Sequence, residues 1–191
     1  INKTKYKNLD AIRSNVDLSG LEIEIANDSK KAFILKEKIE QFHENSTQNY
    51  HYILIDCPPS LSLLTVMALV ASDSLLVPLQ TEFFALEGIT QLIKTIDRIK
   101  SSLNPKLKIR GILLTMFDKR NKLSLQVENE ARDYFKDKVY KTVVPRNVRL
   151  SEAPSHGIPI LFYDKSCAGS KSYIGFTEEF INQEKEFESA A

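Results

Sequence analysis

Asp56 is the residue of this sequence best placed for chemistry, because it ends an apolar run and is followed by Pro58 and Pro59. The apolar residues at positions 53–55 predict a buried strand whose last residue is a carboxylate, and the prolines stiffen the turn after it. In α/β proteins, ligands bind outside the carboxyl ends of the strands. A carboxylate there can hold a Mg²⁺-bound water, or it can simply cap the helix expected from Ser60.

Arg120 and Arg149 are candidates for contact with a polyanion. Arg120 lies in the polar turn 118–122, and Arg149 closely follows Arg146. Exposed arginines suit phosphate contact, which weakens as salt rises; the alternative is that both are ordinary solvated charges. Because the net charge of the chain is only +1, a nucleic-acid-binding surface would have to be a local patch.

The phosphate-binding motif G-x-x-x-x-G-K-[ST] does not occur in the 191 residues, and the six glycines are scattered singly. Phosphates are cradled by backbone N–H groups and a lysine at a helix N-terminus. The sequence therefore supplies a strand-end carboxylate without the loop that would hold phosphates beside it. Cys57 and Cys167 lack metal-binding spacing, so reduced thiols are the simplest interpretation.

Apolar runs and helical periodicities alternate along the chain. Strands or extended segments are expected at residues 7–13, 52–56, 74–78, 109–116, 140–144 and 158–162. Helices are expected at residues 17–25 (capped by Asp17), 30–45, 60–71, 86–99, 123–135 and 172–187. This order predicts an α/β fold with a mostly parallel sheet and helices on both faces. The connections are too short for a linker, so a single domain over residues 1–191 is expected.

Composition places the chain among ordinary globular proteins, with 42% hydrophobic and 27% charged residues. The most apolar run, residues 61–71, is far shorter than the ~20 residues of a membrane helix. No signal peptide is recognisable. These features predict a cytoplasmic protein.

Four segments together resemble the ParA/Soj family of chromosome-partitioning ATPases, which belongs to the MinD/ParA superfamily with a deviant Walker A loop. The segments are residues 52–61, 78–92, 111–118 and 145–157. The first is similar to the family's Walker B and switch II region. The last is long and ungapped and separates this family from other P-loop proteins. The resemblance covers roughly residues 8–175.

The resemblance implies a P-loop NTPase-like fold and a role for each segment. Asp56 would serve the Mg²⁺ side through a water. The other implied sites are switch II at Cys57, Pro58, Pro59 and Ser60; nucleotide contacts from Thr115, Met116, Pro145, Arg146 and Asn147; and DNA contacts from Arg120 and Arg149. Pro145-Arg146-Asn147 would lie against the adenine, although proline and asparagine also favour a plain turn.

The resemblance also implies ATP and Mg²⁺ as cofactors, an ATP-dependent homodimer, non-specific DNA, and a ParB-type centromere-binding partner that stimulates hydrolysis. A bacterial, nucleoid-associated protein of chromosome or plasmid partition is expected. The acidic segment 178–188 disfavours the basic membrane-binding helix of the related ATPase MinD. No membrane partner is therefore expected.

The family's Walker A loop, with its two lysines, would precede Ile1. The chain is therefore expected to be the C-terminal two-thirds of a ParA-type ATPase domain, without the N-terminal P-loop strand and helix. No catalytic residue is expected in this chain, and ATP should bind it weakly. The alternative is a non-enzymatic remnant that acts only as a partner- or DNA-binding module.

Overall fold

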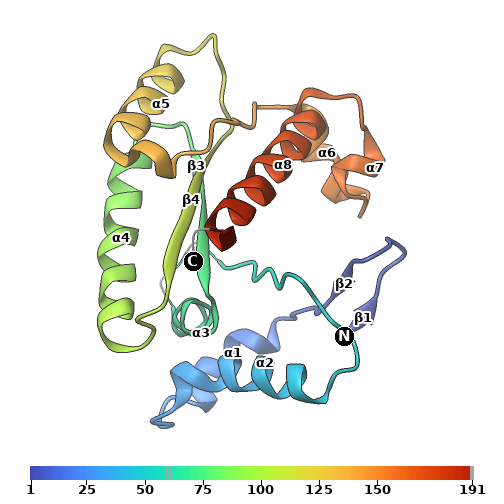
Figure 1. Ribbon diagram of the computed structural model, residues 1–191, viewed down its shortest axis with the longest axis vertical. Coiled ribbons are helices and arrows are strands. Elements are labelled where there is room, and N and C mark those ends of the chain that lie inside the picture. The colour runs from blue at the N-terminus through green and yellow to red at the C-terminus, as the bar shows by residue number, and fades with distance from the viewer. Residues whose placement is uncertain (59, 61, 190–191) are drawn as a thin grey trace. The chain divides into compact units, whose positions relative to one another are not determined.

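The computed structural model describes residues 1–58, 60 and 62–189. The chain forms two compact units, Ile1–Ser72 and Asp73–Ala191, called unit 1 and unit 2 below (Figure 1). The expectation of one domain over the whole chain stays a prediction. No described helix has the length and apolar character needed to cross a membrane.

Unit 1 begins with a small antiparallel ladder. β1 (Asn2–Lys3) pairs with β2 (Asp10–Ala11), and Lys3 Nζ lies 2.7 Å from a carboxylate oxygen of Asp10. The strand expected at residues 7–13 is thus reduced to two residues. Four helical elements follow: α1 (Asp17–Glu24), η1 (Lys31–Phe33), α2 (Ile34–Asn45) and α3 (Leu63–Ala71). Asp17 is the first residue of α1 rather than its cap, since Val16 occupies the N-cap position.

The strand expected at residues 52–56 is wrong. These residues have no regular secondary structure, and Leu54 is 88% exposed. A strand is stable only when a neighbour satisfies its backbone N–H and C=O groups. Among the described residues of unit 1, the only ladder is the one between β1 and β2. An apolar run predicts a strand only when its own unit contains a partner to pair with.

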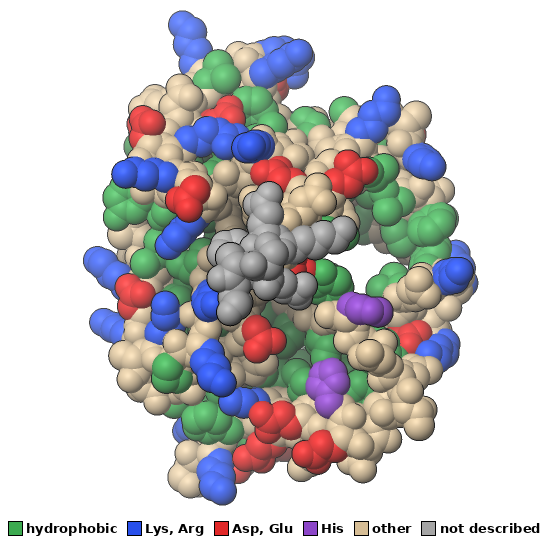
Figure 2. Space-filling view, viewed as in Figure 1, with side chains coloured by type: hydrophobic (Ala, Val, Ile, Leu, Met, Phe, Trp, Pro, Cys, Tyr) green, Lys and Arg blue, Asp and Glu red, His purple; other side chains and the backbone are tan. Residues whose placement is uncertain are grey.

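Unit 2 is built on a parallel pair of strands. β3 (Ser74–Gln80) and β4 (Lys108–Thr115) pair in parallel, with an irregularity between Leu75 and Leu76. The long helix α4 (Ala85–Ser102) connects them, as a parallel crossover requires. In Figure 2, Lys and Arg side chains line the edge of the molecule where α4 lies in Figure 1.

A third segment runs beside β4 without forming a regular strand. After α5 (Lys122–Phe135) and η2 (Lys136–Lys138), the chain makes isolated parallel bridges to β4 and its extension. Tyr140 N donates to Ile112 O at 3.0 Å, and Val144 N donates to Leu114 O at 2.8 Å. The segment 140–144, which was expected to be a strand, therefore lies beside β4 but makes only isolated hydrogen bonds to it instead of a continuous ladder.

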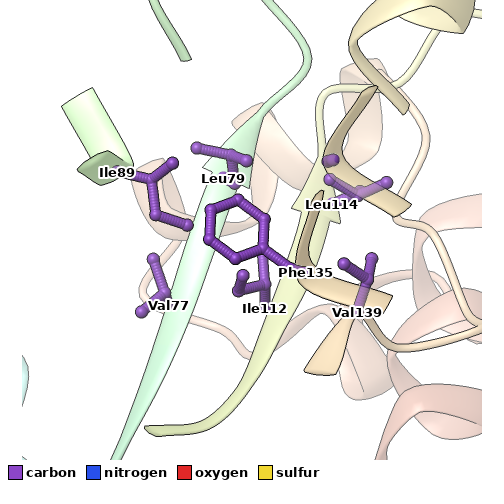
Figure 3. Close-up of a cluster of buried hydrophobic side chains, with 8 residues drawn as sticks. Val77, Leu79, Ile89, Ile112, Leu114, Phe135 and Val139 are labelled. Atoms are coloured by element: carbon purple, nitrogen blue, oxygen red, sulfur yellow. The ribbon is translucent and has the colours of Figure 1, made fainter. Parts of the chain in front are cut away.

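The two faces of the strand pair are covered by different helices, because side chains alternate along each strand. One face carries an apolar cluster with α4 and α5 (Figure 3); its buried members are Val77, Leu79, Ile89, Ile112, Leu114, Ala131, Phe135 and Val139. On the other face, Leu113 joins Tyr140, Val144 and Phe176 of α8 (Ala168–Ser189). The parallel sheet with helices on both faces is confirmed.

Two short helices lie between residues 147 and 164. α6 (Val148–Ser155) was not expected, and α7 (Ile160–Tyr163) replaces the extended segment expected at residues 158–162, which is wrong. Pro159 precedes the first turn of α7, and its carbonyl accepts hydrogen bonds from Phe162 N and Tyr163 N. The fixed φ of proline suits a helix start, which outweighs the apolar run that suggested extended chain.

Glu179 fastens α8 to the segment beside β4. Its carboxylate accepts hydrogen bonds from the backbone of Lys141 at 2.6 Å and of Thr142 at 2.9 Å. Partial burial raises the pKa of Glu179, but the two backbone donors outweigh it and leave that pKa below its usual value. The carboxylate is therefore charged at neutral pH and holds the C-terminal helix in place.

Candidate functional site

The carboxyl end of β4 is joined to the segment that begins at Pro145. Phe117 N donates to Val144 O at 3.1 Å, and Arg146 N donates to Phe117 O at 2.9 Å. Phe117 and Pro145 form a parallel bridge. These bonds bring together two segments that are about thirty residues apart in sequence, and with them the predicted nucleotide contacts Thr115, Met116, Pro145, Arg146 and Asn147.

Backbone geometry and capping fix the shape of this strand end. Met116 has a φ of 54°, which turns the chain sharply after the last residue of β4; a left-handed conformation is uncommon for a side chain of this size. Asn147 is the N-cap of α6, and its side-chain oxygen accepts from Arg149 N at 3.0 Å. The arrangement combines an apolar proline ring with a carboxamide held by its own helix, a combination suited to a planar polar base.

The same end of β3 is tied to α5 by two buried hydroxyls. Thr81 and Ser124 are 2% and 3% exposed, and their hydroxyl oxygens lie 3.2 Å apart. Thr81 N also donates to Thr115 O at 3.1 Å. Arg146 lies 3.5 Å from Glu82 in an exposed ion pair. Together these contacts hold β3, β4 and the 145–147 segment as one platform.

Arg120 is held by a neighbouring carboxylate. Its guanidinium donates to both oxygens of Asp118, at 3.0 and 2.9 Å. Hydrogen bonds from the Arg120 side chain and backbone lower the pKa of Asp118 to about 2. The Arg120 side chain is nevertheless 85% exposed, so the pair faces solvent and a competing anion can reach it.

Arg149 is engaged by two carboxylates. Its Nη1 donates to Glu152 at 2.8 Å, and its Nε lies 3.6 Å from Asp164. Tyr163 OH also donates to Glu152, at 3.2 Å. The Arg149 hydrogen bond lowers the pKa of Glu152. Because the Arg149 side chain is 54% exposed, its place on the surface is compatible with an external anion, in exchange with these partners.

Asp56 and its neighbours belong to unit 1. Asp56, Cys57, Pro58 and Ser60 are all exposed, and Pro59 lies outside the described residues. Desolvation of the thiol, followed by the nearby Asp56 charge, raises the pKa of Cys57. An exposed carboxylate oxygen is a donor that suits Mg²⁺, which one or two protein carboxylates commonly hold together with phosphates. The metal role of Asp56 and the switch II role of residues 57–60 stay predictions.

Sequence reasoning missed the residues that assemble the platform. Phe117 and the pair Thr81 and Ser124 were given no role, yet their bonds join three segments at one strand end. The available signal was positional, since Thr81 directly follows the last residue of β3 and Phe117 lies two residues beyond β4. Ser124 carried no such signal, because it lies within α5.

The chain is similar in sequence to one family model and to several curated proteins. Residues 1–109 match a family model described as an AAA domain. The chain is 51% identical to the chromosome partitioning protein ParA of Caulobacter vibrioides over 99% of its length and 70% of that protein. It is 50% identical to the sporulation initiation inhibitor protein Soj of Bacillus subtilis, over 94% of this chain and 69% of that one.

A solved structure also has a fold similar to that of this chain. Cobyrinic acid a,c-diamide synthase from Mycobacterium smegmatis, with bound ADP and magnesium, superposes with a TM-score of 0.73 at 27% identity. The match covers 90% of this chain and 61% of that one. This likeness identifies the α/β architecture as P-loop NTPase-like. The chain spans about 70% of the length of the partitioning proteins and less of this structure.

Proposed function

This chain belongs to the ParA/Soj family of chromosome-partitioning proteins, and on that premise we propose that it acts in ATP-dependent partition of a bacterial chromosome or plasmid. The partition complex is a homodimer that binds DNA without sequence preference. A ParB-type partner stimulates its hydrolysis of ATP. The protein works at the nucleoid in the cytoplasm.

The observation that supports this proposal best is the junction of residues 115–117 with residues 145–147 at the carboxyl end of β4. Ligands of α/β proteins bind at such strand ends. In the proposed site the adenine lies against Pro145, while the carboxamide of Asn147 and the backbone of Thr115 and Met116 offer polar contacts to its edge. Arg146 closes the site from the side, held by Glu82.

ATP and Mg²⁺ are the proposed cofactors, as in the ADP- and magnesium-bound structure of similar fold. Magnesium, when bound, neutralises phosphate charge and supports in-line transfer of the γ-phosphoryl group. Asp56 is the proposed oxygen donor to a metal-bound water. Because this sequence contains no glycine-lysine phosphate loop, the residues described here hold the base rather than the phosphates.

Arg120 and Arg149 are proposed to contact the phosphates of duplex DNA. Both are exposed, and each pairs with a carboxylate that a phosphate can replace. The two arginines therefore exchange one anionic partner for another, which keeps the net gain per contact small. Such contacts are independent of base sequence and weaken as salt rises.

Replacing Arg120 or Arg149 with alanine is expected to weaken duplex binding and to flatten its salt dependence. Each lost phosphate contact lowers the slope of log affinity against log salt by about 0.9, so a dimer that loses both copies changes by roughly 2. Fluorescence anisotropy of a labelled duplex across a salt series measures both quantities. Arg13→Ala, which removes an exposed arginine from unit 1, is the matched control.

Equal affinities and equal slopes for the two variants and the Arg13→Ala control would contradict the DNA role. In that case both arginines serve only the ion pairs seen in the structure. The dimer fraction is measured in parallel by light scattering, because a change in dimerisation would alter the slope without any lost contact.

A further inference from the structure

A run of cations spans the second half of α4, the turn after it and the start of β4. Its exposed members, called the basic ridge, are Lys94, Arg98, Lys106 and Lys108. The first two lie on α4, and Lys108 is the first residue of β4. Since Thr115 ends the same eight-residue strand, Lys108 is separated from the candidate site by roughly 23 Å of strand.

The turn after α4 keeps the members of the ridge together. Leu103 N and Asn104 N both donate to Ile99 O, at 2.8 and 2.9 Å, and Leu107 N donates to Asn104 O at 3.1 Å. These bonds fold residues 103–107 back against the end of the helix. They place Lys106 and Lys108 beside the last turns of α4.

The segment that carries the ridge has a strong net positive charge. Residues 94–108 hold five cationic side chains and one carboxylate, Asp97, for a net charge of +4, whereas the whole chain carries +1. Asp73 lies close by, since Lys108 N donates to its carbonyl at 3.2 Å. In the part of the chain that the structure describes, no ion pair involves a member of the ridge, whereas Arg120 and Arg149 are both paired.

The ridge has the character of a phosphate-binding surface rather than a membrane-binding one. Its apolar neighbours are turned inward, with Ile96, Ile99 and Leu107 exposed by 1%, 4% and 0%. A helix that lies on a membrane needs apolar side chains to insert beside its cations. Contact with a nucleic-acid backbone needs only accessible cations, and Lys94, Arg98, Lys106 and Lys108 are all exposed.

We propose that the basic ridge is a second contact surface for the phosphate backbone of duplex DNA. The inference rests on the DNA binding proposed above and adds a surface at the opposite end of β4. Because none of the ion pairs among the described residues involves a ridge cation, each of them is expected to contribute more to binding than Arg120 or Arg149, which are paired. Non-specific binding then arises mainly from the ridge.

The test compares two double variants that carry the same charge change. Lys106→Gln/Lys108→Gln removes two ridge cations, and Lys7→Gln/Lys30→Gln removes two exposed lysines from unit 1. Anisotropy of a labelled 30-bp duplex of arbitrary sequence, a length of roughly 100 Å, is measured across a salt series. In the dimer the ridge variant removes four phosphate contacts, so it is expected to lose about 3.6 from the salt slope and roughly tenfold or more in affinity at low salt.

The control variant is expected to change far less, and far-UV circular dichroism verifies that both variants are folded. Equal behaviour of ridge and control variants, with Arg120→Ala still impaired, would overturn this inference and leave the proposed function intact. Absence of duplex binding by the unmodified chain would overturn both. Binding to phosphatidylglycerol vesicles that the ridge variant loses, with an unchanged duplex slope, would assign the ridge to a membrane instead.

Discussion

Replacing Phe135 with alanine is expected to lower the free energy of unfolding of unit 2 by about 3–5 kcal/mol. Phe135 is 8% exposed and belongs to the apolar cluster between α4, α5 and the strand pair (Figure 3). It also lines a pocket of about 150 Å³ beside that cluster, with Asp97, Lys100 and Lys138 in its lining. Removing the ring enlarges this pocket, so the loss of packing contacts adds to the loss of burial.

The neighbouring residue provides the control for Phe135→Ala. Tyr134 is 70% exposed and touches the Phe135 ring edge-on, with centroids 4.7 Å apart. Tyr134→Ala is expected to cost no more than about 1 kcal/mol. Urea unfolding followed by far-UV circular dichroism measures both variants, since the chain has no tryptophan. Similar losses for the two substitutions would contradict the assignment of Phe135 to the core.

Replacing Gly111 with alanine is expected to destabilise unit 2 by about 1–3 kcal/mol through overpacking. A Cβ at this position would collide with Cε2 of Tyr140 and would lie 2.9 Å from its Cζ and 3.1 Å from Lys138 O. Tyr140 is 2% exposed and packs edge-on against Phe176, with centroids 4.8 Å apart. Its ring therefore has no room to retreat.

Gly88→Ala is the matched control, with an effect of opposite sign. Gly88 lies in α4, and a Cβ there would meet nothing within 4 Å. Alanine should stabilise this helix by roughly 0.5–1 kcal/mol, because it restricts the unfolded chain more than glycine does. The same urea unfolding assay applies. A neutral or stabilising Gly111→Ala would show that Tyr140 can move away from β4.

The architecture of unit 2 was predictable because its signals are local and strong. The apolar runs that became β3 and β4, and the 3- and 4-residue spacing that became α4 and α5, need only the periodicities of strand and helix. The alternation of Ile112, Leu113 and Leu114 between two faces follows from the same rule. The parallel sheet with helices on both faces could therefore be predicted from the sequence itself.

The predicted secondary structure was wrong where a non-local partner or a single residue decides the structure. Residues 52–56 were expected to form a strand from apolar content alone, but pairing depends on what else their unit contains. The segment after Gly157 was expected to be extended, yet Pro159 starts α7 there. α6 begins where Asn147 caps it, but Asn147 and the neighbouring Pro145 also favour a plain turn.

The residues proposed for the candidate site came from the resemblance, and how they assemble could not be predicted from the sequence. The nucleotide contacts were named from resemblance, and the structure brings those of unit 2 to one strand end. Of the carboxylates that pair with the two arginines, the partner of Arg120 could be predicted from the sequence, whereas Asp164 as a partner of Arg149 could not. Asp118 is two residues from Arg120, whereas Asp164 reaches Arg149 only because α6 and α7 fold back on the N-terminus of α8.

Titration of the ¹⁵N-labelled chain with Mg·ATP, followed by amide chemical shifts, tests the central claim most directly. We expect saturable shifts at the amides of Thr115, Met116 and Arg146, with a dissociation constant of about 1 mM, or about −4 kcal/mol. The affinity is expected to be weak because the sequence contains no glycine-lysine phosphate loop. Unchanged amides at this strand end up to about 10 mM nucleotide, a concentration well above that constant, would contradict the assignment of the site.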